Sequence, residues 1–151
     1  MKNAVTVDSS VFLSNLFKDE TNHEISVNLL NILSKNRTQI IIPIIVYFEV
    51  LHNYYRASKN QKETDEISEE FILMNQINRL KIINLEAPSL AQFVTEHHNF
   101  DLKTSDTVLA LCAMSSNIPL ITWDEKLIKH CKGKISAFTP QEFLQQASQS
   151  S

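Results

Sequence analysis

At 151 residues the chain has the length of one domain, and its 43% hydrophobic and 21% charged residues are those of a globular protein that can bury a core without disulfides. The chain has a single glycine, Gly133. It therefore cannot contain the G-x-x-x-x-G-K phosphate loop, the G-x-G-x-x-G dinucleotide loop or the G-x-S-x-G nucleophile elbow, each of which needs at least two. The net charge of −3 gives no basic footprint of the kind that nucleic-acid binding usually leaves.

The first half of the chain alternates between short apolar stretches and helical patterns. Residues 3–7 are rich in β-branched side chains and stop at Asp8-Ser9-Ser10, which predicts a strand and then a helix capped by Ser9 or Ser10. After it, the pattern predicts a helix over 23–35, a strand over 39–42 that ends at Pro43, a helix over 44–57, and a polar stretch over 58–70 that leads into a solvent-facing helix ending near Asn78.

The second half continues this alternation. The pattern predicts a strand over 81–85, a helix over 88–97, a helix over 104–116, a strand over 118–122, a helix over 125–130 that stops at Gly133, and a strand over 134–138. The segment Thr139-Pro140-Gln141-Glu142 predicts the start of the last helix. This segment combines a capping threonine, a proline at the first helical position and an acid three residues after the cap.

Short apolar strands separated by helices are typical of a parallel sheet that is covered on both faces. We therefore expect an α/β protein with a single-domain, three-layer fold and a mostly parallel sheet of four to five strands. The domain is expected over 1–145, with a disordered tail over 146–151. We find no signal peptide and no apolar run long enough to cross a bilayer, so we expect a cytoplasmic protein without a membrane contact.

Two aspartates come directly after predicted strands. Asp8 ends the first strand, and Asp124 follows the strand over 118–122. Parallel sheets bind their ligands beyond the carboxyl ends of the strands, which makes both acids candidate functional residues. Each also has a structural alternative, because aspartate is a favoured N-cap of a following helix.

Glu49 lies in an apolar segment of the helix predicted over 44–57. A carboxylate there is costly to bury unless something compensates its charge. It either pairs with a base on the same helix, such as His52 or Arg56, or faces a polar centre such as a metal ion. The residues alone leave both alternatives open.

Asp106 lies in the first turn of the helix over 104–116, which we expect to be capped by Thr104 or Ser105. A favourable interaction with the helix dipole would by itself explain an acid at that place. The nearby Asp101 precedes the cap and is interpreted as a turn residue.

Taken together, four acids fall where a parallel sheet would gather them at one edge. A cluster of like charges destabilises itself unless a cation fills it, and carboxylate oxygens suit Mg²⁺ or Mn²⁺ rather than Zn²⁺. The histidines show no metal-ligand spacing, and the two cysteines form no C-x-x-C pair. The predicted site consists of Asp8, Glu49, Asp106 and Asp124.

The order of these motifs resembles the PIN domain family, and in particular its small single-domain members of the VapC toxin type. The likeness extends over about residues 3–143. This chain departs from the family at Thr107, where alanine is usual, and at Asn117, where glycine is common, and Trp123 fills a variable position. The matching segments are Val7-Asp8-Ser9-Ser10-Val11, residues 43–49, Thr104-Ser105-Asp106, and Ile118-Pro119-Leu120-Ile121-Thr122-Trp123-Asp124.

The resemblance implies a PIN-like fold and an endoribonuclease that depends on Mg²⁺ or Mn²⁺ to hydrolyse RNA phosphodiesters. Its catalytic and metal-binding residues would be the four acids. Ser10 and Thr122 would donate hydrogen bonds that orient these acids, although capping of the adjacent helices explains both hydroxyls equally well. In the toxin branch, the resemblance further implies a homodimer that a small antitoxin protein neutralises.

Other functions stay open at this point. One is a free-standing PIN nuclease that processes RNA without an antitoxin, and another is a PIN-like module that binds RNA or protein without cleavage. An unrelated α/β phosphohydrolase or phospho-acceptor domain would normally carry a second acid beside the first. Here Ser9 and Ser10 follow Asp8, which argues against that class.

Overall fold

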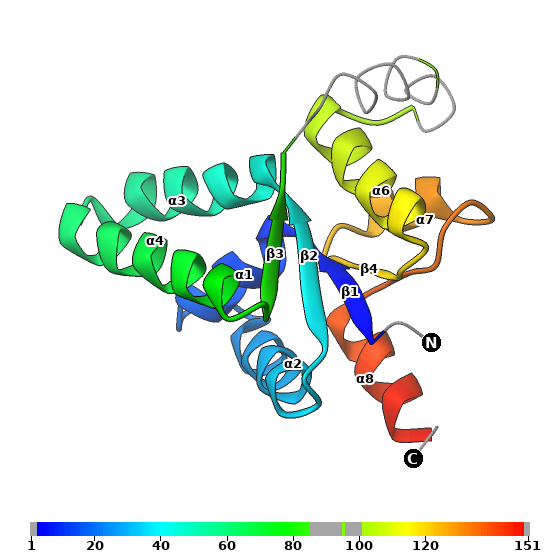
Figure 1. The fold of residues 1–151 in the computed structure, drawn as a ribbon, viewed down its shortest axis with the longest axis horizontal. Coiled ribbons are helices and arrows are strands. Elements are labelled where there is room, and N and C mark those ends of the chain that lie inside the picture. Colours follow the sequence, from blue (N-terminus) through cyan, green and yellow to red (C-terminus); the bar gives the residue numbers. More distant parts are fainter. Residues whose placement is uncertain (1–2, 85–94, 96–100, 150–151) are drawn as a thin grey trace.

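The computed structural model describes residues 3–84, 95 and 101–149, which contain five strands and seven helices (Figure 1). The strands are β1 (Ala4–Val7), β2 (Gln39–Pro43), β3 (Leu80–Ile83), β4 (Leu120–Ile121) and β5 (Ala137–Phe138). The helices are α1 (Ser9–Leu16), α2 (His23–Lys35), α3 (Ile44–Ser58), α4 (Gln61–Gln76), α6 (Thr104–Ser116), α7 (Glu125–Cys131) and α8 (Pro140–Gln149). The helix predicted over 88–97 lies outside the described residues, apart from position 95.

All five strands pair in parallel, in the order β3-β2-β1-β4-β5. The expected α/β fold with a sheet of four to five strands is therefore confirmed, and the described sheet is wholly rather than mostly parallel. The last two strands are shorter than predicted, because only two residues of each enter the ladder. Beside them, Thr6 N donates to Pro119 O at 2.8 Å and Leu120 N donates to Ser136 O at 2.9 Å.

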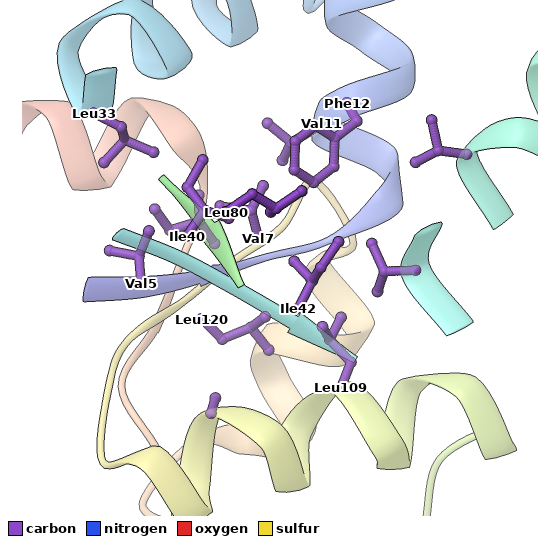
Figure 2. Close-up of a cluster of buried hydrophobic side chains, with 14 of the residues drawn as sticks. Val5, Val7, Val11, Phe12, Leu33, Ile40, Ile42, Leu80, Leu109 and Leu120 are labelled. Carbon is purple, nitrogen blue, oxygen red and sulfur yellow. The ribbon is translucent and has the colours of Figure 1, made fainter. Parts of the chain in front are cut away.

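The sheet is covered on both faces by apolar helix surfaces. Val11 and Phe12 of α1 pack on one side of the strands and Leu109 of α6 packs on the other (Figure 2). Helix α2 packs against α1 and α8, while α3 and α4 lie side by side next to β3 (Figure 1). Burying each such Leu, Ile, Val or Phe side chain contributes about 1.5–3 kcal/mol, so this core is the main source of stability. No helix in the described ranges has the length and apolar character needed to span a bilayer.

Strand β1 occupies the place where the strand order reverses. The chain builds outward from β1 through β2 to β3, and then returns to add β4 and β5 on the other side. In such a sheet, the loops after the two strands at the reversal lead away to different faces and leave a crevice at their carboxyl ends. Here those strands are β1 and β4, and the residues that follow them are Asp8 and Thr122 to Asp124.

The start of α1 differs from the prediction. The helix begins at Ser9, and Asp8 is its N-cap residue with extended backbone angles, so the prediction that Ser9 or Ser10 caps it is wrong. The carboxylate of Asp8 makes no capping hydrogen bond to the helix. Both serine hydroxyls point to carboxylates instead, which is a tertiary arrangement that the local pattern does not reveal.

Two other helix starts also differ from the sequence pattern. Helix α6 begins at Thr104 with Lys103 as its N-cap residue, so the predicted caps Thr104 and Ser105 are wrong. Helix α4 begins within the polar stretch, where Asn60 Oδ1 accepts a hydrogen bond from Glu63 N at 3.2 Å. This helix is solvent-facing as predicted, but it also buries a stripe of Thr64, Ile67 and Phe71.

The predicted capping box of the last helix is confirmed. Thr139 Oγ1 accepts from Glu142 N at 3.2 Å, and Glu142 Oε2 accepts from Thr139 N at 2.8 Å. Helix α8 then continues to Gln149, so residues 146–149 are helical in the structure although the sequence pattern placed a disordered tail from 146 onward.

The shortage of glycine has a visible consequence in the backbone. Five described residues other than glycine adopt left-handed angles, which cost about 1–2 kcal/mol for most side chains. Asn117, at the position where PIN domains often have glycine, is one of them, with φ of 51° at the end of α6. Asparagine tolerates this conformation better than most residues. The full set is Arg37, Lys59, Asn78, Asp101 and Asn117.

We predict that Lys59→Gly stabilises the protein by about 0.5–1 kcal/mol, because glycine removes the steric cost of the left-handed conformation. Lys59 ends α3 with φ of 55°, and its amide donates to Tyr55 O at 2.8 Å. Urea unfolding measures the change. The matched control is Lys59→Ala, which also removes the lysine side chain but keeps the strain; equal stabilisation by both variants would contradict the explanation.

Candidate active site

Asp8 lies at the carboxyl end of the central strand and is almost completely buried, with 8% of its surface exposed. Its Oδ2 atom accepts two short hydrogen bonds, from Ser10 Oγ at 2.6 Å and from Thr122 Oγ1 at 2.7 Å. A buried carboxylate is costly unless hydrogen bonds compensate the lost water. These two hydroxyls supply that compensation and fix the orientation of the carboxylate.

The same two hydroxyls also hold the turn that follows β4. Ser10 Oγ accepts from Trp123 N at 3.2 Å, and Thr122 Oγ1 accepts from Asp124 N at 2.9 Å. Each hydroxyl thus bridges the acid after β1 to the backbone of the turn after β4. The hydrogen bonds that we expected Ser10 and Thr122 to make to an acid are present, and neither hydroxyl caps a helix.

Glu49 approaches the same edge from the second turn of α3. Its Oε2 accepts from Ser9 Oγ at 2.9 Å, and this hydroxyl also lies 3.3 Å from Asp8 Oδ1. Neither His52 nor Arg56 forms a salt bridge with Glu49 in the part of the chain that the structure describes. In place of a base, the described residues give Glu49 a hydroxyl that it shares with Asp8.

Ser9 is the residue of this site that the sequence pattern did not single out. The sequence predicts a helix cap at Ser9, yet its hydroxyl lies between two of the four acids. Its position directly after Asp8 is the feature of the sequence that indicates a hydroxyl at the same sheet edge.

Asp124 is exposed and caps the helix that follows it, α7, as its position in the sequence predicted. Its Oδ1 accepts from Lys126 N at 2.8 Å and from Leu127 N at 3.1 Å, which caps α7. Only this oxygen is used by the cap. The capping interpretation is therefore confirmed, and it leaves Oδ2 as the oxygen that can face a ligand.

Asp106 lies in the first turn of α6 and is half-buried. Burial raises the pKa of its carboxyl group, and the negative charges of Asp8, Asp124 and Glu49 raise it further, while Lys103 acts in the opposite direction. The charges of the other three predicted acids thus all reach Asp106 at this edge of the sheet. Asp101, the rival acid, has a φ of 50° in the turn before α6, as expected for a turn residue.

The donor set fits a hard cation in its chemistry, because all four groups are carboxylates. In the described ranges, however, no three Asp, Glu, His or Cys side chains form a group that could hold a metal ion. The acids share an edge without converging on one point. The hydroxyls of Ser9, Ser10 and Thr122 donate hydrogen bonds to Glu49 and Asp8.

Comparison with known proteins assigns the family. Residues 5–133 match the PIN domain, so the chain belongs to the PIN domain family. This match contains all four acids and agrees with the motif order from which the resemblance was inferred. Comparison with curated proteins gave no match.

Solved structures with a similar fold include a toxin–antitoxin complex from Klebsiella pneumoniae, which is 18% identical, with a TM-score of 0.63 over 90% of this chain and 97% of that chain. VapBC2 from Rickettsia felis, bound to a DNA fragment from its promoter, is 20% identical, with a TM-score of 0.64 over 90% of this chain and 98% of that chain. FitAcB from Neisseria gonorrhoeae is 16% identical, with a TM-score of 0.66 over 91% and 98% of the two chains. VapBC-1 from nontypeable Haemophilus influenzae is 14% identical, with the same TM-score and coverage. At these identities the likeness establishes the fold.

We predict that Asp124→Ala lowers the free energy of unfolding by about 1 kcal/mol, the usual cost of a lost N-cap. Asp124→Asn is expected to cost only a few tenths of a kcal/mol, because asparagine caps helices about as well as aspartate. Urea unfolding with a chelator present measures both. Equal losses in the two variants would show that charge rather than capping matters for stability at this position.

The raised pKa of Asp106 predicts a dependence of stability on pH. The folded state holds the Asp106 proton more tightly than the unfolded state, so the free energy of unfolding falls as pH rises from the ordinary aspartate pKa through the raised one. In chelator at pH 7, Asp106→Asn should therefore be more stable than the parent protein.

This stability difference should shrink as pH falls below the ordinary aspartate pKa, where the carboxyl group is neutral in both states. Urea unfolding at several pH values measures it, with Asp65→Asn on the exposed surface of α4 as the control. A gap that stays constant over the whole pH range would contradict the assigned environment of Asp106.

Proposed function

We propose that this PIN domain is a cytoplasmic endoribonuclease that hydrolyses RNA phosphodiesters with Mg²⁺ or Mn²⁺. The observation that carries the proposal is the buried, doubly hydrogen-bonded carboxylate of Asp8 at the reversal point of the sheet. Its charge and those of Glu49 and Asp124 all raise the pKa of Asp106 at the same edge. Ligands of parallel sheets bind at this position. Family membership supports the same conclusion, because PIN domains are typically nucleases.

The residues that would hold the cation are the four acids. A bound Mg²⁺ or Mn²⁺ supplies a Lewis acid that activates water and neutralises charge on the phosphate. Metal sites depend on hydrogen-bond partners that orient their ligands. Ser10 and Thr122 orient Asp8, and Ser9 orients the side chain of Glu49. The ligands proposed are Asp8, Glu49, Asp106 and Asp124.

The geometry gives the acids different tasks in this proposal. Asp8 cannot swing away, because two hydroxyls and its burial hold it, so it is the preorganised anchor of the site. Asp124 offers Oδ2 while Oδ1 stays on the cap of α7. No side chain near the acids needs to act as a covalent nucleophile in this reaction, since hydrolysis proceeds by in-line attack of water on phosphorus.

We further propose that the protein is the toxin of a toxin–antitoxin pair and that it forms a homodimer. The structural relatives that are toxin–antitoxin complexes support this, although only the fold is shared. Large apolar side chains exposed on α3 and at the end of α4 also support a protein partner, since such side chains are costly to leave in water. They are Phe48, Tyr55, Ile72, Leu73 and Ile77.

The free-standing nuclease is the alternative to the toxin. Co-expression with the product of an adjacent small gene separates the two. A toxin should co-purify with this product and lose its activity, because an arginine of the partner can bind carboxylates with two charge-assisted hydrogen bonds. A processing enzyme should purify alone and active.

We predict that Asp8→Asn and Asp124→Asn each lower RNA cleavage in Mg²⁺ at least about 100-fold while the proteins stay folded, because each removes a ligand charge and keeps the side-chain shape. Glu66→Gln, on the exposed face of α4, is the charge-matched control and should cleave at the parent rate. The measurement is the initial rate on a labelled single-stranded RNA. Near-parent rates in either aspartate variant would contradict the site.

The same variants separate a nuclease from a non-catalytic module. Millimolar Mn²⁺ should raise the thermal midpoint of the parent, as any ligand of the folded state does, and should raise that of Asp8→Asn less. A parent protein that binds RNA but shows neither a midpoint shift nor cleavage would support the binding module instead.

A further inference from the structure

Trp123 is the only tryptophan of the chain and lies between Thr122 and Asp124 in the turn after β4. Its indole Nε1 donates a hydrogen bond of 2.9 Å to the hydroxyl of Ser26 on α2. Ser26 is fully buried, and the indole packs partly buried against the hydrophobic core. A hydrogen bond in such surroundings is well shielded from water, so it holds the turn firmly against α2.

The backbone of the same turn is held from its other side. Trp123 N donates to Ser10 Oγ at 3.2 Å, and this hydroxyl donates to Asp8 Oδ2 at 2.6 Å. One residue therefore ties the turn after β4 to two neighbouring helices. Its amide donates to Ser10 of α1, which in turn donates to the buried acid, and its indole donates to Ser26 of α2.

The two hydrogen bonds of Trp123 affect the position of the neighbouring acid, Asp124. Asp124 follows Trp123 immediately, and its carboxylate position depends on where the turn lies. The cap on α7 fixes Asp124 relative to its own helix, but not relative to Asp8. The pairing of β4 with β1 and the hydroxyl bridges hold the start of this turn beside Asp8, and the indole contact to α2 is a further restraint on the turn that carries Asp124.

We propose that Trp123 is a positioning residue, whose hydrogen bond to Ser26 sets the place of the Asp124 carboxylate relative to Asp8 and thereby the affinity of the site for its divalent cation. This inference rests on the proposed function of the four acids. It assigns a role to a side chain that touches none of the reacting atoms. It also explains why a large aromatic residue stands at a position that the family leaves variable.

The test is a double-mutant cycle with Trp123→Phe and Ser26→Ala, which remove the same hydrogen bond from its two ends. Mn²⁺ affinity is measured by calorimetry at a temperature far below the thermal midpoint. Each single variant should bind Mn²⁺ about ten-fold more weakly than the parent, at the lower end of the usual effect of residues that support metal ligands. The double variant should be no weaker than either single variant. The KM for RNA should stay unchanged while kcat falls at sub-saturating Mn²⁺.

The matched control is Ser68→Ala. Ser68 also bonds to an aromatic side chain, the hydroxyl of Tyr47 at 2.6 Å, but it lies on α4, which carries none of the four acids. This variant also loses one hydrogen bond to an aromatic side chain and should keep the Mn²⁺ affinity of the parent. Since Ser26→Ala and Ser68→Ala retain Trp123, its emission during a Mg²⁺ titration gives a second measure of affinity that needs no catalysis.

The outcomes separate this inference from the function on which it rests. Parent-like Mn²⁺ affinity in folded Trp123→Phe and Ser26→Ala, or effects that add in the double variant, would overturn the positioning role alone. An equal loss of affinity in Ser68→Ala would overturn it as well, because general destabilisation would then explain the result. A parent protein that binds neither cation would overturn the proposed metal site, and the positioning role with it.

Discussion

The arrangement of the site depends on one carboxylate that is buried at the end of a central strand. Asp8 has lost nearly all contact with water, and the hydroxyl groups of Ser10 and Thr122 compensate that loss. Thr122 comes from the far end of the chain, 114 residues away, and it can reach Asp8 only when β4 pairs with β1. Because the buried Asp8 carboxylate needs the hydrogen bond from Thr122, it favours one register between β1 and β4 and one path for the turn after β4.

The alternation of strands and helices was predictable because it depends on the local spacing of apolar residues and on the residues that begin and end helices. Helices α2 and α6 begin and end at the predicted residues, and the last helix begins with the predicted capping box. The parallel pairing of the strands follows from this alternation together with the rule that parallel strands need crossovers. The order β3-β2-β1-β4-β5 does not follow from local patterns and comes from the structure. Strand lengths were less predictable, because the number of residues that enter a ladder depends on the neighbouring strand rather than on composition.

The acids could be located in the sequence, but their surroundings could not. Position at a strand end indicated Asp8 and Asp124, and an apolar neighbourhood indicated Glu49. The role of Ser9 could not be predicted, because a serine at a helix start is usually a cap, and only the tertiary structure shows that its hydroxyl faces carboxylates. For Ser10 the sequence left a cap and a contact with an acid equally open, and the structure shows the contact with Asp8. The hydrogen bond between Trp123 and Ser26 joins residues 97 positions apart, so no local sequence pattern could predict it.

In the hairpin of α3 and α4, the residue that belongs to the site and the connection that sets the hairpin length lie at opposite ends. Glu49 lies near its base, beside the acids, whereas the two-residue connection at 59–60 lies at its far tip (Figure 1). Whole helical turns can be added or removed at the tip without moving the sheet edge, since both helices would grow together along their shared contact. The length and surface of this hairpin are thus free to diverge between related proteins while the chemistry at its base stays fixed.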